Sequence, residues 1–287
     1  MKLQRIGTRA LGRGAVLWRT SPVGATLLLL AVGLAVVGPY VAPYTPSEVV
    51  GVPYQAPDAQ HPLGTDQLGR DVLSRGCWGG GTLLVLGLFA TWLAYAVGLC
   101  VGLVSGFVGG KADLVMMRIV DLKLAFPSLL FVLIIVSAFP ANAIVLGIAV
   151  AVSQMPSIIR IVRAATMEVS VRPFVEAAIA RGEPLSYVTA REILPNIRAP
   201  IAADIGIRYT ACLLLVASVG FLGLGITPPD ANWALMISEN GPGFSANPAA
   251  VLAPAVLIAT VMLGGNLLAD GFLRGTGRRT NAQEQIV

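Results

Sequence analysis

Two carboxylates and an arginine lie close together in the motif GTDQLGRDVLSR, which begins at Gly64. Paired carboxylates can hold a metal or act as general acid and base, but such a site also needs a nucleophile or a histidine cluster. Neither accompanies Asp66 and Asp71. The motif instead has Gly69 to permit a tight turn and Arg70 to pair locally. We therefore favour a structural turn that sets the entrance to the following helix over a catalytic or metal site.

Other residue types capable of chemistry are sparse. His61 is the single histidine, and Cys77, Cys100 and Cys212 form no Cys-x-x-Cys pair, so we expect no metal site and interpret the cysteines as small buried hydrophobic residues. The sequence contains no Gly-x4-Gly-Lys-Ser/Thr phosphate loop. We expect no catalytic residue, no cofactor in this chain and no ATP hydrolysis by this chain itself.

Two pairs of polar residues stand four positions apart inside apolar segments. Asp204 and Arg208 can pair on one helix face, and we favour a structural ion pair near a membrane interface over a gate element. Asn266 and Asp270 either anchor a polar loop through hydrogen bonds or have a simple interfacial role. Gln154 and Ser218 could line a translocation path, although helix contacts explain these two residues equally well.

One polar stretch, EAAIARGEPLSYVTAREILP, interrupts the apolar sequence from Glu176 to Pro195. Good helix formers run to Ala180, Gly182 can adopt a left-handed cap, and Pro184 suits the first turn of a second helix. That helix is predicted to reach about Leu194, where Pro195 ends or kinks it. Charges of alternating sign fit either a solvated loop or a surface for a protein partner.

The elements that must position these residues are membrane helices. The 287 residues are 55% hydrophobic and only 12% charged, and a bilayer core of about 30 Å needs about twenty apolar residues as helix. We therefore predict an all-α polytopic membrane protein with six transmembrane helices. The predicted segments are 22–43, 82–108, 124–140, 143–162, 200–224 and 250–273.

Charge patterning predicts the orientation. Seventeen of the 20 lysine and arginine residues lie on the side of the two termini, which is expected to be cytoplasmic; Arg70 and Arg75 lie opposite, and Arg208 lies within the fifth segment. The basic residues form no aromatic-interleaved patch, so we expect membrane lipid and no nucleic acid as a partner. Trp78 and Trp233 are expected to anchor at the interfaces.

The polar stretch also resembles a family motif. Glu-Ala-Ala at 176–178, Gly182 and Ile-Leu-Pro at 193–195 resemble the EAA loop of bacterial ABC importer membrane subunits. Four further blocks resemble the C-type permease of dipeptide, oligopeptide and nickel importers. They are HPLGTDQLGRDVLSR, GGKADLVMMRIVDLKLAFPS, FLGLGITPPDANWALM and GNLLADGFLRGTGRR. Glu183-Pro184 departs from the small residues usual after the loop glycine, and the C-terminal tail lacks the usual Asp and Pro.

The resemblance implies a type I ABC importer permease fold in the bacterial cell membrane. It implies a cytoplasmic tail at 1–21, a first helix with a long outer loop at 22–81, a transmembrane domain at 82–273 with a coupling loop at about 163–199, and a cytoplasmic tail at 274–287. The implied ATPase-coupling residues are Glu176, Ala177, Ala178, Arg181, Gly182, Pro184, Leu185, Ser186, Leu194 and Pro195.

The implied partners are a homologous B-type permease, ATPase subunits that bind ATP and Mg, and an extracytoplasmic substrate-binding protein, which the motif from Gly64 to Arg75 could touch. The implied substrate is a di- or oligopeptide, with nickel or another small solute as the alternative. Two rivals of other classes stay open. A secondary transporter predicts inverted repeats and broken midplane helices, and a membrane scaffold predicts assembly without transport.

Overall fold

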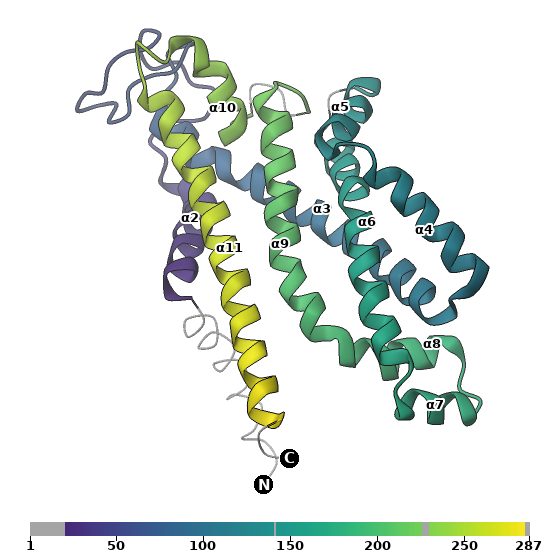
Figure 1. Ribbon diagram of the computed structural model, residues 1–287. Coiled ribbons are helices and arrows are strands. Elements are labelled where there is room, and N and C mark those ends of the chain that lie inside the picture. The colour runs from purple at the N-terminus through teal and green to yellow at the C-terminus, as the bar shows by residue number, and fades with distance from the viewer. Residues whose placement is uncertain (1–20, 141, 226–229, 285–287) are drawn as a thin grey trace. The chain divides into compact units, whose positions relative to one another are not determined.

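The computed structural model describes residues 21–140, 142–225 and 230–284, with side chains as far as residue 271. The described ranges contain helices and no β-strand, apart from the isolated bridges Val49↔Arg70 and Thr65↔Asp71. Figure 1 shows the helices. Their bounds are α2 Pro22–Val41, α3 Val72–Val108, α4 Gly110–Leu124, α5 Ser128–Ala138, α6 Ala143–Ser170, α7 Pro173–Ala180, α8 Leu185–Tyr187, the π-helix η1 Val188–Ile193, α9 Leu194–Phe221, α10 Trp233–Asn240, the 3-10 helix η2 Gly241–Gly243 and α11 Ala249–Glu284.

The all-α, multi-pass membrane architecture is confirmed. Five described helices are long and apolar enough to cross a bilayer, and α4 with α5 makes a sixth candidate, bent by 85°. The five are Pro22–Val41, Val72–Val108, Ala143–Ser170, Leu185–Phe221 and Ala249–Gly271.

The third crossing differs most from its prediction. The hydropathy pattern placed one segment at 124–140, whereas the structure has a charged helix, α4, a break, and then the short apolar α5. The charges of α4 conceal it from a hydropathy window, and Pro127 disfavours helical geometry at Phe126, so the chain bends there. A broken helix is one of the features that the secondary-transporter hypothesis predicts.

Two other helices extend further than predicted. Helix α3 begins at Val72 instead of 82, because the glycines of GCWGGG lie inside a helix, where they accommodate Trp233. A Cβ at Gly79 would lie 2.9 Å from the Trp233 indole. The helix that contains Pro195 does not end there, since Leu185–Phe221 is continuous.

The chain divides into two compact units. The first comprises Met1–Val85 and Gly220–Val287 and contains α2, the start of α3, α10 and α11. Here α2 and α11 lie side by side (Figure 1). A Cβ at Gly24 would lie 2.7 Å from Leu267, and one at Gly264 would lie 2.9 Å from the Leu28 nitrogen. The two helices therefore run antiparallel in close contact.

The second unit, Leu86–Val219, contains the rest of α3, most of α9 and the helices between them. Three glycines on one face of α3 meet α6 at Ile158, Val162 and Thr166. They are Gly98, Gly102 and Gly106. The steps of four residues match on both helices, so α3 and α6 run parallel, with backbones brought close by the glycines.

Candidate functional site

A tight turn joins α7 to α8 in the stretch that the sequence singles out. Gly182 has φ +77°, its N–H donates to the Ile179 carbonyl at 2.9 Å, and the Glu183 N–H donates to Ala178 at 3.3 Å. These two bonds form a Schellman motif, in which a left-handed residue after the helix satisfies its last carbonyls. The predicted helix–turn–helix with Gly182 at the turn is confirmed.

Beyond the turn the chain enters a helix that continues into the membrane segment. Pro184 precedes α8 as its N-cap, one position earlier than predicted. A π-helical turn, η1, follows, in which the Leu194 N–H reaches back five residues to the Thr189 carbonyl. Pro195 lacks an N–H to donate, and its place directly after this widened turn lets the helix continue. The segment from Leu185 therefore forms one continuous helix with α9.

We refer to α7, the turn at Gly182, α8 and η1 as the coupling element, after the role that the family resemblance implies. Its polar residues are largely exposed. The Glu176 side chain is exposed and has no ion pair among the described residues, and Ala177 is exposed while Ala178 is buried. Arg181 lies 3.7 Å from a Glu183 oxygen and 3.8 Å from one of Glu192. Exposed pairs of this kind contribute little stability, so they leave the charges available to a partner.

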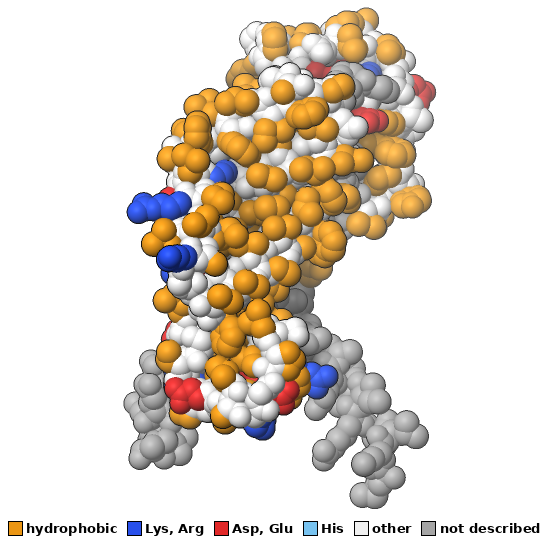
Figure 2. Space-filling model, turned by 90° about the vertical axis from the view of Figure 1, so that its right-hand side faces the viewer, with side chains coloured by type: hydrophobic (Ala, Val, Ile, Leu, Met, Phe, Trp, Pro, Cys, Tyr) orange, Lys and Arg blue, Asp and Glu red, His pale blue; other side chains and the backbone are white. Residues whose placement is uncertain are grey.

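Apolar side chains are also exposed on the coupling element. Phe174, Ile179 and Leu185 are 40%, 50% and 42% exposed, whereas Val175 of α7 and Ile193 of η1 are buried where the two helices pack. Figure 2 shows acidic and basic side chains around the lowest described lobe, with hydrophobic ones between them. An apolar centre with charged groups of both signs at its rim is typical of a protein-docking surface.

The predicted outer-loop motif folds into a compact turn before α3. Gly64 and Gly69 have φ of +68° and +76°, as the tight turns require. Asp66 accepts from the backbone N–H groups of Leu68 and Arg70 at 2.8 and 2.9 Å. The motif is therefore a turn that is held by hydrogen bonds within itself, as expected for a structural turn before the helix.

Four charged side chains form a buried network on this turn. Asp66 Oδ2 lies 2.6 Å from both Arg70 Nε and Arg75 Nη1, and Glu239 of α10 lies 2.7 Å from Arg75 and 3.2 Å from Arg70. Each side chain is at most 8% exposed. Two positive and two negative charges balance, which is what burial of ions demands. Sequence reasoning missed Arg75 and Glu239, because 164 residues separate them.

Asp71 has a different partner from the one expected. Its carboxylate accepts from the Ser74 N–H at 2.7 Å, so it caps the start of α3, and it lies 3.1 Å from His61 Nδ1. Asp58 accepts from the His61 backbone N–H at 2.6 Å, and this bond holds the pKa of Asp58 below its usual value. No group of three or more metal ligands occurs among the described residues.

Asparagines and a tryptophan join the loop to the C-terminal helices of the same unit. Asn240 accepts from the Gln67 N–H at 3.0 Å, and Asn247 donates to the Leu63 and Thr65 carbonyls at 3.0 Å. Trp233 is fully buried and donates to the Gly76 carbonyl at 2.7 Å. The prediction that Trp233 anchors at a membrane interface is therefore wrong, because its indole fills the space above the glycines of α3.

The predicted pair on α9 belongs to a larger cluster in the second unit. Arg208 Nε lies 3.2 Å from both oxygens of Asp204, Tyr95 of α3 donates to Asp204 at 2.5 Å, and Arg208 Nη1 lies 3.4 Å from the Gln154 oxygen. Tyr95 and Gln154 lie near the middle of the predicted crossings 82–108 and 143–162. The ion pair is confirmed, and it forms part of a cluster with Tyr95 of α3 and Gln154 of α6.

The remaining predicted positions lie on α3, α9 and α11. Asn266 and Asp270 are both exposed on α11. Ser218 donates to the Leu214 carbonyl of its own helix, which accounts for its hydroxyl without a path-lining role. Cys212 is buried as expected, but Cys100 is exposed, so the prediction of a buried residue is wrong there.

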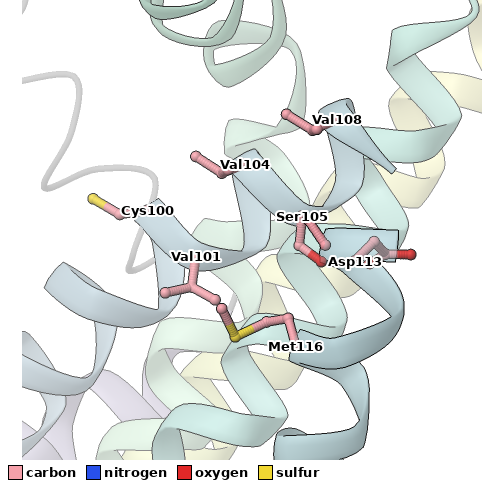
Figure 3. A pocket seen from close by; sticks show the side chains of 8 residues that line it. Cys100, Val101, Val104, Ser105, Val108, Asp113 and Met116 are labelled. Atoms are coloured by element: carbon pink, nitrogen blue, oxygen red, sulfur yellow. Dashed lines mark hydrogen bonds between the residues drawn. The ribbon is translucent and has the colours of Figure 1, made fainter. Parts of the chain in front are cut away.

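Two grooves are apolar. One of about 280 Å³ lies between α3 and α4 (Figure 3), where the polar atoms of Ser105 and Asp113 hydrogen-bond each other. The other, of about 550 Å³, is lined in the first unit by Leu63, Leu252 and other apolar residues. Neither groove offers free polar groups for a polar solute.

Comparison with known proteins places these features in context. Residues 98–281 match the family described as "Binding-protein-dependent transport system inner membrane component". The chain is 32% identical to the dipeptide transport system permease protein of Haemophilus influenzae, covering 88% of each chain. It is 34% identical to the di/tripeptide transport system permease protein of Pseudomonas aeruginosa, over 86% of this chain and 84% of the other. It is 30% identical to a glutathione transport system permease protein of Pectobacterium atrosepticum, over 85% and 82%.

Proposed function

Because the chain belongs to the family of inner membrane components of binding-protein-dependent transport systems, we propose that it is the permease subunit of an ATP-driven importer of short peptides. It pairs with a homologous permease, receives substrate from an extracytoplasmic binding protein, and couples to ATPase subunits that hold ATP and Mg. This chain contributes the transport path and no catalytic residue. Its family membership weighs against the secondary transporter, despite the bent α4–α5 pair.

The coupling element is the observation that supports ATP coupling most directly. Its Schellman turn orients α8 relative to α7, three of its apolar side chains are exposed, and α8 continues through η1 into α9. A displacement of α8 by a partner would therefore be passed on to α9 through a continuous helical backbone. This is the arrangement that a motor on another chain needs in order to rock membrane helices.

The relatives support peptides as the substrate class. Those named above are permeases for dipeptides, for di- and tripeptides, and for glutathione, itself a tripeptide. A short peptide is therefore favoured over a nickel ion. The described residues also contain no cluster of metal ligands that would favour a metal ion as cargo.

The distribution of basic residues supports the orientation. Seventeen of the 20 lysines and arginines flank the predicted crossings on the side of the coupling element and both termini. One of these, Lys123, contacts the middle of α6 in the structure, so sixteen support the orientation. Positive charge is retained in the cytoplasm. We infer that both termini and the coupling element face the cytoplasm, where ATP is available to the partner subunits.

A crosslinking experiment tests the proposed function. Ser186 is an exposed residue of α8, and Ser186→Cys in the assembled transporter is expected to crosslink to a cysteine in the ATPase cleft, with a yield that changes on ATP binding. Ser47→Cys, at an exposed serine of the predicted outer loop, is the matched control and is expected to give no such product.

Three outcomes would contradict the proposal. A Ser186→Cys crosslink that is absent, or insensitive to ATP, argues against the coupling role. Peptide uptake into vesicles driven by a proton or sodium gradient without ATP would restore the secondary transporter. Assembly of a complex that moves no solute under either condition would favour the scaffold.

A further inference from the structure

Positive charge exceeds negative charge around the middle of α6. Arg208 of α9 and Lys123 of α4 both contact this helix. Among the described residues, Asp204 contacts Arg208, and no carboxylate contacts Lys123. Charged groups in spanning segments are costly, and those that persist commonly mark a path for a polar solute. The surplus cation therefore requires an explanation beyond helix packing.

Lys123 has no carboxylate partner within the described residues. Its Nζ donates to the Ser153 carbonyl and hydroxyl, the latter at 3.1 Å, and lies 5.2 Å from the centre of the Phe131 ring. The acidic residues of its own helix are already paired, Asp113 with Arg163 and Asp121 with Arg160. A lysine held in place without a counter-ion is poised to attract an anion.

Arg208 has one open hydrogen-bonding edge. Its Nε is shared between the two oxygens of Asp204 at 3.2 Å, and its Nη1 makes a long contact of 3.4 Å with Gln154. Its Nη2 has no hydrogen-bond partner among the described residues, and the side chain is 18% exposed. The guanidinium fork is therefore only partly satisfied, although a carboxylate could engage it through two parallel bonds.

The two cations contact neighbouring residues of α6. Arg208 contacts Gln154 and Lys123 contacts Ser153, which are adjacent residues near the middle of the predicted crossing 143–162. Four helices supply the cluster, because Tyr95 of α3 donates to Asp204 Oδ2 at 2.5 Å beside the groups from α4, α6 and α9. The acid is thus fully occupied, and the groups left with unused donors are positively charged.

Building on the proposed function, we propose that Arg208 and Lys123 bind the carboxylate group of the transported peptide during its passage. The fork of Arg208 engages the carboxylate, and Lys123 adds charge beside it. Asp204 orients Arg208 in the empty path, and the ion pair closes again once the carboxylate has left.

The two ends of the Asp204–Arg208 pair provide the test. In the complete transporter in vesicles, ATP-driven uptake of a labelled unmodified dipeptide should fall about tenfold or more in Arg208→Gln, the loss expected for a charged hydrogen-bonding group. Asp204→Asn keeps Arg208 charged and should reduce uptake less than about threefold. If the pair were merely structural, Arg208→Gln and Asp204→Asn would reduce uptake to the same extent.

Further variants separate binding from folding. Arg208→Lys should recover part of the uptake, and ATPase activity stimulated by the loaded binding protein should persist in every variant. Lys123→Gln should reduce uptake several-fold, whereas Arg118→Gln, which removes an exposed cation from the same helix, should not.

Three results would overturn the inference. They are normal uptake in Arg208→Gln, equal losses in Arg208→Gln and Asp204→Asn, or loss of assembly together with uptake even in Arg208→Lys. Failure of the proposed function has a different signature, because the unmodified transporter would then take up no dipeptide with ATP.

Discussion

Gly182 shows how one residue fixes the direction of a helix that a partner would contact. A Cβ at this position would meet nothing within 4 Å, so the glycine is not required by packing. Its φ of +77° is the constraint, since a side chain in the left-handed region costs about 1–2 kcal/mol. The requirement for glycine at position 182 is therefore its backbone conformation and not its packing.

Substitution of Gly182 separates these two causes. Gly182→Val is expected to shift α8 and to reduce ATP-driven peptide uptake, because a β-branched residue resists a positive φ. Gly182→Asn is the control, since asparagine tolerates this conformation and adds bulk to open space. Uptake that falls equally in both variants would show that size, and not backbone conformation, matters there.

The buried network around Arg75 makes a second prediction at this scale. Glu239→Gln removes one of two negative charges that balance Arg70 and Arg75, and an uncompensated buried charge costs about 3–5 kcal/mol. We expect a clear fall in the unfolding temperature of the purified transporter. Glu48→Gln, at an exposed carboxylate, is the control and should leave it unchanged. A fall of the same size in the control would contradict this role.

Single residues were predictable from sequence where the cause was local. The left-handed Gly182 and the pairing of Asp204 with Arg208 follow from spacing along one segment. Glu239 and Tyr95 were missed, because their partners lie 164 and 109 residues away and no periodicity marks such pairs. Long-range polar contacts depend on helix packing, which residue spacing does not encode.

At the scale of helices, glycine spacing determines how closely α3 approaches α6. A Cβ at Gly98 would lie 2.8 Å from Ile158, one at Gly102 would lie 2.7 Å from Val162, and one at Gly106 would lie 2.8 Å from the Arg163 carbonyl. Within a bilayer, helices gain little from hydrophobic burial against each other, so close packing of small residues contributes instead. The stripe is therefore a structural contact and not a binding site.

Enlarging the middle glycine should separate the two helices. Gly102→Leu is expected to destabilise the protein by about 1–3 kcal/mol, the usual cost of overpacking a close contact. Gly33→Leu on α2 is the matched control, because nothing lies within 4 Å of that position. Thermal unfolding in detergent measures both variants, and an equal effect in the control would refute the packing role.

Helices were predictable where apolar length alone decides, as for α2 and α6. The start of α3 was missed because GCWGGG has the composition of a loop, and only the packing of Trp233 shows why its glycines are helical. Pro195 ends many helices, but here the π-turn η1 precedes it, and a π-turn has no sequence signature of its own. Neither the helical start of α3 nor the π-turn before Pro195 could be predicted from the sequence pattern of its own segment.

At the scale of the whole molecule, hydropathy and family motifs predicted a multi-pass permease. They did not predict the bent α4–α5 pair. The coupling element and the charged cluster on α6 lie in the same unit, and both involve the helix from Leu185 to Phe221. A motion imposed at α8 therefore has a direct mechanical route to Asp204 and Arg208.

A break in the helix from Leu185 to Phe221 is expected to uncouple ATP hydrolysis by the partner subunits from peptide uptake. Two glycines inserted after Ile193, where η1 meets α9, would add flexible backbone and turn α8 relative to Arg208, since each helical residue rotates the chain by roughly 100°. We expect ATPase activity to persist in the assembled transporter while peptide uptake is lost. The same insertion after Gly109, in an open break between α3 and α4, should be tolerated because that segment already carries two glycines with positive φ. Uptake that survives the insertion after Ile193 would show that the force from the ATPase subunits reaches the membrane helices by another route.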